Sequence, residues 1–442
     1  MPALNTDLYE LTMAAGYFAA GKTQEIATFE LLIRRLPEHR NFLIAAGLEQ
    51  AVEYLGGLAF GKQELDYLRS LPQFHNASPD FFNCLADLRF TGDLFAVPEG
   101  TPIFANEPIA IVRAPLIEAQ LIETYLLSTF AFQTMIASKA ARCVIASEGR
   151  PIVEFGSRRA HGPEAGILAG RAAYLAGCAG TSNTEAGMRF GIPVFGTAAH
   201  SWTMSFPSEE ESFRALQELL GDTTVFLLDT YDTIEGARLA ARLGHPIWGV
   251  RLDSGDLVAL SREVRRILDN AGLQDAKIFA TNDLNEHRIT ELVRSGAPFD
   301  AFGVGTQLAT SADAPALGAV YKLVELKRGN TLQYAAKFSD EKSTLPGAKQ
   351  IYRSRDRDVV ALYSECNSDF HGTPLVRPVI NNGELVEPLP PLAKSREDAQ
   401  TAIAALPKEL LSLTEQTSYP VEISPRLVQL AETLRQELQP AR

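Results

Sequence analysis

The chain has 442 residues, 46% hydrophobic and 21% charged, so it is long enough for two globular domains and is neither disordered nor fibrous in composition. Its formal net charge of −13 disfavours binding to nucleic acid or to an anionic membrane, because both require a basic surface. The 4 cysteines are far apart and form no C-x-x-C pair, which argues against a zinc ribbon or a secreted disulfide framework.

No targeting or membrane-spanning segment is predicted. The first residues lack a basic region followed by an apolar run, so they do not resemble a signal peptide. The most apolar stretch, residues 121–137, is interrupted by Glu123, Thr124 and Gln133, and is too short and too polar to span a bilayer. We therefore expect a cytoplasmic protein.

The first part of the chain mixes helical and strand patterns. Residues 8–19 and 45–55 have helical periodicity, and residues 28–33 alternate like a strand. Residues 95–113 are typical of short strands with turns, and a long amphipathic helix is predicted from about 115 to 146. We expect an N-terminal α+β domain over residues 1–135.

From residue 149 a repeating pattern begins, in which an apolar run ends in a polar cluster and a helical segment usually follows. The runs are 152–155, 177–179, 194–195, 224–228, 247–250, 277–280 and 299–302. Such units predict a parallel sheet with helical crossovers. An open sheet concentrates its ligand contacts at one switch point, whereas a barrel spreads them over many strand ends. Since polar clusters follow nearly every run, we predict an α/β barrel over residues 136–326, and this barrel is the expected catalytic domain.

After about residue 326 the repeat is lost. Residues 331–338 and 359–363 resemble strands, and the proline-rich residues 385–393 resemble a surface connection. Residues 425–438 predict a terminal helix with Ser424 as N-cap and Pro425 at its first position. We expect residues 327–400 to join the N-terminal domain and residues 401–442 to form a helical tail.

A glycine-containing cluster closes the last strand of the repeat. Gly303 and Gly305 would let backbone N–H groups approach a phosphate, and Thr306 opens the next helix. Glycine at a strand end is often just a tight turn. However, loops after the late strands of α/β barrels frequently bind phosphate, which favours a phosphate site here.

Three charged residues follow the strand that ends at residue 250. Alternation turns Arg251 and Asp253 to the same face, where a guanidinium can bind a carboxylate or phosphate and a carboxylate can accept from sugar hydroxyls or hold a metal. The alternative is a structural Arg251–Asp253 pair with Asp256 capping the next helix. Because Asp229 ends the preceding strand, we favour a functional role for this edge.

His200 follows another strand end, as do Arg158 and Arg159. A lone histidine is more often structural. However, His200 is predicted to lie at the same level of the barrel as the other strand-end clusters, which favours a role in the site. Its chemistry could be acid–base, nucleophilic or donation to a phosphate. The histidines form no H-x-x-x-H or H-E-x-x-H pair, so no zinc site is expected and no metal ligand is assigned. The clusters suit a phosphorylated sugar and an anionic co-substrate, but do not name a reaction.

The sequence resembles the nicotinate phosphoribosyltransferases in several segments that occur in order from residue 6 to about residue 353. These are TDLYELTM (6–13) with GY (16–17), FEL (29–31) with RR (34–35), FGSRRAHG (155–162), GTSN (180–183), GTAAHS (196–201), LDTY (228–231), GVRLDSGD (249–256), GVGT (303–306), YKLV (321–324) and KSTLPGAK (342–349). Beyond residue 353 little resemblance is found.

The resemblance implies a type II phosphoribosyltransferase-like fold, with an irregular TIM-like barrel and a mixed α+β domain. It implies that nicotinate displaces diphosphate from 5-phosphoribosyl 1-diphosphate, in NAD biosynthesis or salvage, with Mg²⁺ on the diphosphate and coupled ATP hydrolysis. The protein should position both substrates and stabilise the departing diphosphate around an oxocarbenium-like state. A homodimer with a shared active site is also expected.

The resemblance assigns a role to each matched residue. Tyr9 would stack on the nicotinate ring of its own subunit or of the neighbouring subunit of a dimer, while Thr197 and Arg251 would hold the ring's surroundings and carboxylate. His200 would be phosphorylated by ATP. Residues Gly303, Gly305 and Thr306 would bind the 5-phosphate, and Arg158 and Arg159 are candidates for the diphosphate or carboxylate. Asp229 and Asp253 are candidates for ribose hydroxyls or Mg²⁺, chiefly from their position at strand ends.

Two other functions compete with this one. A nicotinamide phosphoribosyltransferase would bind a neutral amide and should have an extra acidic residue facing the ring, whereas arginines dominate the strand ends here. A non-catalytic phosphosugar- or nucleotide-binding regulator on the same fold would be expected to lose His200, Arg251 or Asp253, and all three are present.

Overall fold

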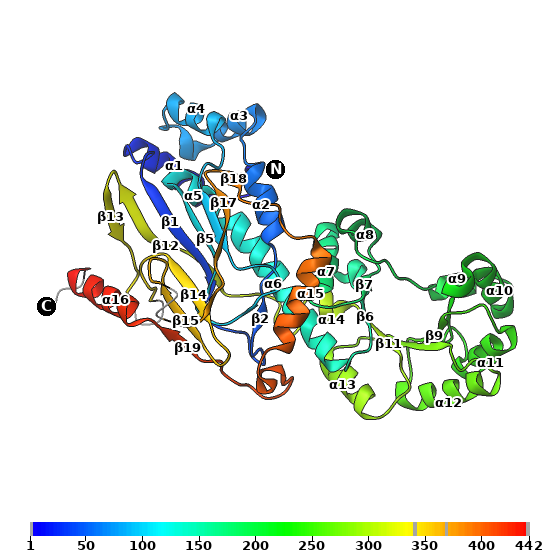
Figure 1. Ribbon diagram of the computed structural model, residues 1–442. Helices are drawn as coiled ribbons and strands as arrows, with labels where there is room; N and C mark the ends of the chain where they lie inside the picture. The colour runs from blue at the N-terminus through cyan, green and yellow to red at the C-terminus, as the bar shows by residue number, and fades with distance from the viewer. Residues whose placement is uncertain (1–2, 339–342, 367–369, 439–442) are drawn as a thin grey trace. The chain divides into compact units, whose positions relative to one another are not determined.

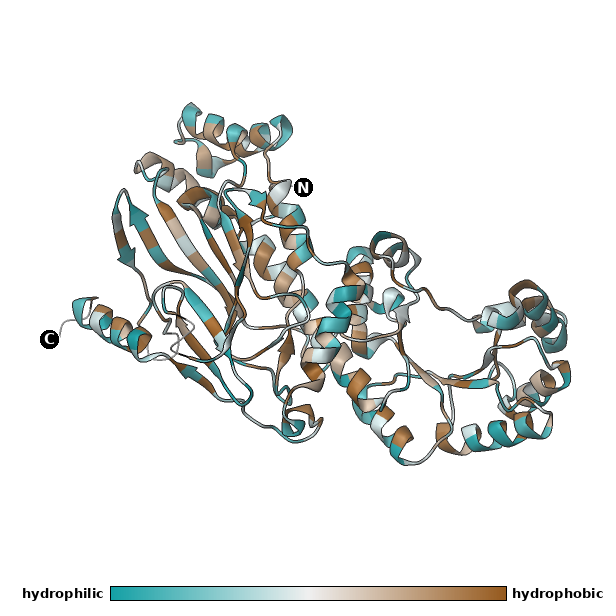
Figure 2. Cartoon of the chain, in the orientation of Figure 1, coloured by the Kyte–Doolittle hydropathy of each residue, from teal (hydrophilic) through white to brown (hydrophobic). Residues whose placement is uncertain are grey.

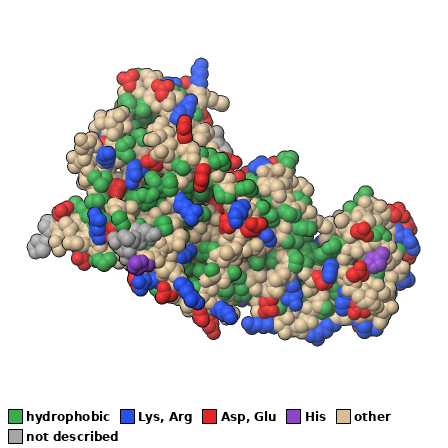
Figure 3. Space-filling view, viewed as in Figure 1, with side chains coloured by type: hydrophobic (Ala, Val, Ile, Leu, Met, Phe, Trp, Pro, Cys, Tyr) green, Lys and Arg blue, Asp and Glu red, His purple; other side chains and the backbone are tan. Residues whose placement is uncertain are grey.

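The chain folds as two units in the computed structural model, which describes residues 3–338, 343–366 and 370–438 (Figure 1). The first unit comprises Met1–Thr134 with Ala316–Arg442, and the second comprises Met135–Pro315. Lys342, which belongs to the last of the family-like segments, lies outside the described residues. On the face that Figure 3 shows, basic and acidic side chains are interspersed.

The first unit is built on a seven-stranded antiparallel sheet with strand order β13-β12-β1-β5-β3-β17-β18. Its strands are β1 (Ile26–Ile33), β3 (Asp93–Ala96), β5 (Pro108–Pro115), β12 (Ala319–Arg328), β13 (Thr331–Tyr334), β17 (Arg377–Asn381) and β18 (Glu384–Leu385). Nearly every residue of β1 and β5 is buried, so both faces of the sheet are covered at its centre. Phe29 of β1 stacks on Tyr321 of β12 at 4.6 Å between ring centroids.

Two smaller sheets and several helices complete the first unit. The strands are β2 (Leu43–Ile44) with β4 (Pro102–Ile103), and β16 (Thr373–Pro374), β14 (Lys349–Arg353), β15 (Asp358–Leu362) and β19 (Val421–Ile423) in that order. The helices are α1 (Leu8–Ala19), α2 (Leu48–Gly56), α3 (Lys62–Ser70), α4 (Pro79–Asp87), α5 (Leu116–Leu121), α15 (Leu392–Ala404) and α16 (Pro425–Leu438). The predicted helix at residues 8–19 is confirmed. The predicted surface connection at residues 385–393 is confirmed for residues 386–391, which are irregular and mostly exposed, while its ends belong to β18 and α15.

The chain after residue 401 belongs to the first unit. Strand β19 pairs in parallel with β15, and Leu427 of α16 packs in a buried cluster with Val360 and Leu362. The predicted cap of α16 is confirmed, because the Ser424 hydroxyl accepts a hydrogen bond from the Leu427 N–H at 3.1 Å. The described part of the predicted tail is therefore packed into the first unit.

The predicted long helix over residues 115–146 is two helices, α5 and α6 (Glu123–Ala146). The interruption lies at Ile122, where the backbone has φ −97° and ψ −3° and leaves the regular helical conformation. Residues on both sides of the break are buried, so apolar residues occur on both sides of it. The sequence pattern therefore continues across this point and does not reveal the interruption. No helix in the described residues is long and apolar enough to cross a membrane.

The second unit is built on a six-stranded parallel sheet with strand order β7-β6-β11-β10-β9-β8. Its strands are β6 (Ile152–Glu154), β7 (Gly180–Thr181), β8 (Val225–Leu227), β9 (Gly249–Leu252), β10 (Lys277–Ala280) and β11 (Ala301–Val304). The helices of this unit are α7 (Pro163–Leu175), α8 (Thr184–Phe190), α9 (His200–Met204), α10 (Glu209–Leu220), α11 (Thr233–Leu243), α12 (Leu257–Asn270), α13 (Glu286–Arg294) and α14 (Thr306–Ala309). The predicted alternation of parallel strands and helices is confirmed.

Helix α12 illustrates how these helices cover the sheet. Its buried residues Leu257, Ser261, Val264 and Leu268 recur every three or four positions, which places them on one helical face. Figure 2 shows hydrophilic residues elsewhere along the helix. The apolar stripe of each such helix packs inward, and the strand ends are left to carry polar side chains.

The described residues form an open sheet, and the predicted closed barrel is not found. The predicted strand at residues 194–195 makes a single bridge, from Val194 to Thr181 of β7, and no described pairing joins it to β8. When this bridge is included, residues 194–195 lie next to β7, at the end of the sheet opposite β8. The strand order is then that of a closed ring, except that residues 194–195 and β8 are not paired with each other. At the opening, Val194 and Phe195 are 46% and 45% exposed, so this short segment is not held by burial on both faces.

Candidate active site

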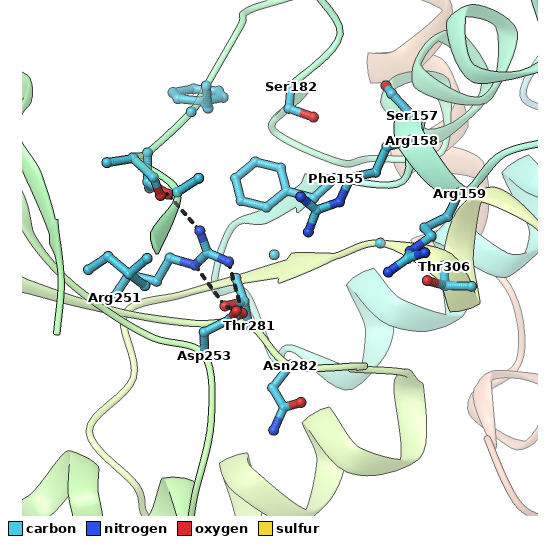
Figure 4. A pocket seen from close by; sticks show the side chains of 18 of the residues that line it. Phe155, Ser157, Arg158, Arg159, Ser182, Arg251, Asp253, Thr281, Asn282 and Thr306 are labelled. Atoms are coloured by element: carbon cyan, nitrogen blue, oxygen red, sulfur yellow. Dashed lines mark hydrogen bonds and ion pairs between the residues drawn. The ribbon is translucent and has the colours of Figure 1, made fainter. Parts of the chain in front are cut away.

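A cavity of about 660 Å³ lies at the carboxyl ends of the parallel strands of the second unit (Figure 4). Parallel strands present their carboxyl ends at one edge of a sheet, so the polar clusters that follow them meet there. The predicted site residues that line the cavity are Arg158, Arg159, Thr197, His200, Arg251, Asp253, Gly303, Gly305 and Thr306. Two other predicted residues, Asp229 and Tyr9, do not line it. The volume is that of a typical small-molecule site.

Arg251, in β9, is held by three hydrogen bonds to neighbouring side chains. Its Nε donates to Thr281 Oγ1 at 2.9 Å, its Nη1 to Thr197 Oγ1 at 2.8 Å and its Nη2 to Asp253 Oδ1 at 2.8 Å. The Thr281 hydroxyl also donates to the same Asp253 oxygen. A guanidinium has five N–H donors, so two remain for a ligand. The alternative interpretation, a structural Arg251–Asp253 pair, is present as a contact, but this pair also faces the cavity.

The carboxylates that follow the β9 strand and its neighbour differ in their surroundings. Asp256 caps α12, as the structural alternative predicted, by accepting hydrogen bonds from the N–H groups of Val258 and Ala259. Asp229 accepts a hydrogen bond from the Ser254 hydroxyl through Oδ2, while its Oδ1 is buried without a hydrogen-bond partner in the described structure. Among the described residues, no group of three or more His, Cys, Asp or Glu side chains could hold a metal ion.

Arginine and glycine residues line the end of the cavity formed by the loops after β6 and β11. Arg158 and Arg159 are exposed in a short 3₁₀ turn that packs against α14, and Figure 4 shows Arg159 beside Thr306. Gly303 is also required by packing: a Cβ there would lie 2.8 Å from Thr281 Cγ2 and 2.9 Å from a Phe155 ring carbon. This end therefore combines cationic side chains with closely approaching backbone, which is a suitable environment for phosphate.

His200 is the first residue of α9 and remains accessible. Its Nδ1 lies 3.2 Å from Thr230 Oγ1, and its Nε2 lies 3.9 Å from Asp253 Oδ2. The side chain is 44% exposed. One ring nitrogen is thus oriented by a hydroxyl while the other faces the carboxylate that binds Arg251, so the ring is positioned and can still meet a ligand.

Several cavity residues were missed by sequence reasoning. Phe155 lies between Arg251 and Arg158 in Figure 4, and Phe195 is another aromatic residue of the cavity wall. Asn282 and Asp283 also line the cavity and adopt positive φ values of 91° and 45°. Such conformations are uncommon outside glycine and often occur at functional sites. The available signal was position alone, since Phe155 and Phe195 end predicted strands, and Asn282 and Asp283 belong to the polar cluster that follows another.

Gly156 follows β6 at a point where no side chain fits. A Cβ at this position would lie 2.2 Å from Ala309 Cβ and 2.8 Å from the Gly305 carbonyl oxygen, so the backbone would have to move. Gly156→Ala should therefore lower the free energy of unfolding by about 2 kcal/mol, as overpacking does in tightly packed regions. Denaturant unfolding would measure the effect. Gly196→Ala, where a Cβ meets nothing within 4 Å, is the matched control for stability, and equal stability of the two variants would contradict the prediction.

Tyr9 lies on α1 in the first unit, and its side chain is 45% exposed. Burial of its hydroxyl end and the nearby carboxylates of Glu123 and Glu10 raise the pKa of Tyr9 above its ordinary value, so the phenol stays protonated. The aromatic ring thus offers a neutral exposed surface. The next residue, Glu10, is fully buried and accepts hydrogen bonds from the Thr124 N–H at 3.0 Å and from the Thr6 hydroxyl.

Burial raises the pKa of Glu10 to about 7 from an ordinary value of 4.5, against the opposing effect of the hydrogen bonds from Thr124 and Thr6. Between these pH values the folded protein binds a proton that the unfolded chain has lost, so stability falls as the pH rises from about 4.5 to about 7. We expect the free energy of unfolding of the wild type to fall by about 2 kcal/mol between pH 5 and pH 8 because of this group, and we expect Glu10→Gln not to show this fall.

Urea unfolding at pH 5, 6.5 and 8 would test this expectation, with the exposed Glu384→Gln as a control that keeps the wild-type profile. An unchanged pH profile in Glu10→Gln would show that this carboxyl does not titrate on folding.

The fold and the cavity define an α/β protein with an arginine-lined cavity at the carboxyl edge of a parallel sheet. Three family models cover most of the chain: the nicotinate phosphoribosyltransferase N-terminal domain at residues 4–131, the nicotinate phosphoribosyltransferase family at residues 151–361 and the corresponding C-terminal domain at residues 363–431. The chain belongs to the nicotinate phosphoribosyltransferase family.

Similar proteins occur in bacteria and mammals. A nicotinate phosphoribosyltransferase of Mycobacterium tuberculosis is 46% identical over 437 residues, which cover 96% of this chain and 92% of that protein. The Bacillus subtilis nicotinate phosphoribosyltransferase is 40% identical over 458 residues, covering 96% and 93%. The crystal structure of human nicotinic acid phosphoribosyltransferase superposes with a TM-score of 0.83 at 29% identity, covering 97% of this chain and 99% of that one.

Proposed function

We propose that this protein transfers the phosphoribosyl group of 5-phosphoribosyl 1-diphosphate to nicotinate, forming nicotinate mononucleotide and diphosphate in NAD biosynthesis or salvage. In this reaction the bond from C1 of the ribose to the diphosphate oxygen breaks, and a bond from C1 to the pyridine nitrogen forms. The protein contributes by positioning both substrates and stabilising the charge that develops on the leaving diphosphate.

The observation that carries the proposal is the arrangement around Arg251. Thr197, Thr281 and Asp253 hold the guanidinium in one orientation and leave two N–H groups for a ligand. A carboxylate is the planar partner that two such donors bind best. The lining residues include three arginines against two aspartates, Asp253 and Asp283, which favours nicotinate over the neutral nicotinamide.

Phe155 supplies a surface for the pyridine ring. It is half-buried and packs edge-to-face on Phe279 at 5.5 Å between ring centroids, which fixes the orientation of its own ring. Because Phe155 lies between Arg251 and Arg158 in Figure 4, a ring stacked on it could place its carboxylate at Arg251 and its nitrogen toward the phosphate-binding end. Phe195 offers a second apolar wall.

The phosphoribosyl donor would occupy the other end of the cavity. Gly303, Gly305 and Thr306 would bind the 5-phosphate, and Arg158 and Arg159 would bind the diphosphate. Mg²⁺ would neutralise part of the diphosphate charge. Magnesium sites of this kind use one or two carboxylates together with phosphate oxygens and water, and Asp253, which lines the cavity, fits that chemistry. Asp229 is the second candidate: its Oδ1 has no hydrogen-bond partner, but the residue lies outside the cavity lining.

ATP is proposed as a co-substrate through His200. The exposed imidazole, oriented by Thr230, is suited to accept the γ-phosphoryl group, with ADP as leaving group and later hydrolysis of the P–N bond. Stored phosphorylation energy would then drive the transfer toward product. The sequence motifs provide no separate ATP site, so ATP is proposed to use the same phosphate-binding end.

Tyr9 and the exposed Leu8 and Met13 of α1 support the proposal that two copies form a homodimer with a shared active site. These side chains are 45%, 43% and 37% exposed, and exposed apolar groups on one helix are typical of an interface. Sedimentation of wild type and of Tyr9→Ala would give the oligomeric state. For the fold we propose an irregular α/β barrel that is open beside Val194, and for localisation the cytoplasm.

The decisive experiment is turnover of labelled nicotinate against labelled nicotinamide at equal concentration, with 5-phosphoribosyl 1-diphosphate, Mg²⁺ and ATP. We expect nicotinate mononucleotide as the main product. A strong preference for nicotinamide would favour the amide-specific alternative. Binding of the phosphoribosyl donor without any mononucleotide would favour a non-catalytic regulator.

A further inference from the structure

Two polar side chains, Glu154 and Thr181, are fully buried next to the cavity at the ends of neighbouring strands β6 and β7. Glu154 Oε2 accepts a hydrogen bond from Thr181 Oγ1 at 2.6 Å, and Glu154 Oε1 accepts one from the Gly156 N–H. The same Thr181 oxygen accepts a hydrogen bond from the Asn183 N–H at 3.0 Å. Neither Glu154 nor Thr181 lines the cavity, so neither touches substrate in the proposed reaction.

This pair is joined to three successive loops that do line the cavity. The Gly156 N–H is the first donor of the loop that carries Arg158 and Arg159, and the Asn183 N–H belongs to the loop after β7. The backbone of Thr181 also binds the third segment: its N–H donates to Pro193 O at 3.1 Å, and its carbonyl accepts from Phe195 N at 3.0 Å. A side-chain bond from Asn183 Nδ2 to Ser157 Oγ at 3.0 Å joins the first two loops directly.

The hydrogen bonds allow one consistent arrangement of protons around an ionised Glu154. A carboxylate is an acceptor only, so the Thr181 hydroxyl must donate to it, which leaves the Thr181 oxygen to accept from Asn183. Burial raises the pKa of Glu154 above its ordinary value, against the opposing effect of the hydrogen bonds from Thr181 and Gly156. Removing either donor would leave a buried oxygen without a partner, which is costly in a site of low dielectric constant.

Close packing prevents the loops from adjusting around this pair. A Cβ on Gly156 would meet the Gly305 carbonyl oxygen at 2.8 Å, and a Cβ on Gly170 of α7 would lie 3.0 Å from Thr181 Oγ1. Displacement of the hydroxyl is therefore passed to the backbone of the surrounding loops, since the space around it is already filled.

We propose that Glu154 and Thr181 form a buried positioning pair that holds the loops after β6 and β7 and the segment at Phe195 in the geometry that binds 5-phosphoribosyl 1-diphosphate. This inference rests on the proposed function for the identity of the ligand. Arg158 and Arg159 provide the charge that binds the anion, and Glu154 with Thr181 determines where that charge lies. The two are positioning residues, because they act through the loops that they hold.

Thr181→Val tests the proposal, because it keeps the shape of the side chain and removes the hydroxyl. We expect the KM and the calorimetric Kd for 5-phosphoribosyl 1-diphosphate to rise roughly 10-fold, with kcat changed by less than about 3-fold, since binding geometry is lost before chemistry. Thr181→Ser restores the hydroxyl and should return both values to within about 2-fold of wild type. Glu154→Gln should show an intermediate loss, because its single amide oxygen can accept from the Thr181 hydroxyl or from the Gly156 N–H but not from both.

Thr224→Val is the matched control for stability. Thr224 is also fully buried and donates a hydrogen bond from its hydroxyl to Gly221 O at 2.7 Å, but it precedes β8 and so lies at the opposite edge of the sheet. Thr224→Val should lower the unfolding temperature yet leave the KM and Kd for the phosphoribosyl donor unchanged.

Each outcome separates the inference from the proposed function. If wild type makes mononucleotide but Thr181→Val keeps the wild-type KM and Kd, the positioning pair is wrong and the function stands. If wild type makes no mononucleotide, the proposed function fails, and the calorimetric comparison of Thr181→Val with Thr181→Ser still decides the inference. If Thr181→Val and Thr224→Val raise the KM and Kd for 5-phosphoribosyl 1-diphosphate equally, Glu154 and Thr181 affect only the stability of the protein, and the proposal is overturned.

Discussion

Arg251→Ala should lower kcat/KM for nicotinate by roughly 300-fold. The variant removes the two donors available for the carboxylate and leaves Asp253 without its guanidinium partner. Loss of one member of a hydrogen-bonded charge pair typically costs 2–5 kcal/mol, and about 3.4 kcal/mol corresponds to this change in rate. Initial rates over a range of nicotinate concentrations would measure it.

Arg251→Lys separates charge from geometry. Lysine keeps the positive charge but cannot donate to Thr197, Thr281 and Asp253 while also binding a carboxylate through two parallel bonds, so we expect an activity between those of wild type and Arg251→Ala. The preference for nicotinate over nicotinamide should fall in the same order. A variant Arg251→Ala that discriminates between acid and amide as well as wild type would show that the carboxylate binds elsewhere.

His200→Ala should abolish stimulation by ATP while mononucleotide synthesis without ATP continues. The ratio of the rates with and without ATP should fall to about 1, because no other side chain is proposed to receive the phosphoryl group. With γ-labelled ATP, wild type should retain an acid-labile label on the protein and His200→Ala should retain none.

The matched control for this experiment is His245→Ala. His245 is another exposed histidine of the second unit, with its Nε2 3.3 Å from Asp275 Oδ1, and no role is proposed for it. It should keep both the label and the stimulation. Persistent ATP stimulation in His200→Ala would assign the phosphoryl acceptor to a different residue. Thr230→Val, which removes the hydroxyl beside Nδ1, should weaken stimulation without eliminating it.

The sequence pattern predicted the strand ends of the second unit well because the signal is local. An apolar run followed by a polar cluster requires only neighbouring residues, and β10 has the predicted bounds while β6 and β8 end one residue earlier than predicted. Strands β9 and β11 begin and end two residues later than predicted, so Arg251 and Gly303 lie within these strands and not after them. The short strand β7 was also predicted poorly, as was the segment at residues 194–195, which makes only a single bridge. The run at residues 177–179 precedes β7, since the two residues that pair, Gly180 and Thr181, carry no apolar signal.

The barrel was predicted from the spread of polar clusters, and this reasoning could not detect the open edge. Closure depends on pairing between residues 194–195 and β8, which is a contact between strands about thirty residues apart. The periodicity of a sequence carries no information about such a long-range contact. Similarly, the chain beyond Arg353 showed little motif resemblance, yet the family's C-terminal domain matches residues 363–431 and β19 pairs with β15.

By itself the sequence determined that polar residues gather at one edge of a parallel sheet, because strand direction and chain order are enough to bring strand ends together. The family-like segments added the chemistry expected there. Tertiary structure alone decided which side chains share the cavity, because this depends on register: Phe279 of β10 lies opposite Arg251 of β9, and Thr281 consequently meets its guanidinium.

The same dependence on register separates residues that look alike in sequence. Asp229 and Asp253 both follow strands, but Asp253 lines the cavity while Asp229 turns to Ser254. Glu154 and Thr181 are adjacent across two strands and become a buried pair beneath the loops, although they lie 27 positions apart in the chain. Side-chain direction and packing, which arise only when the strands are paired, made these distinctions.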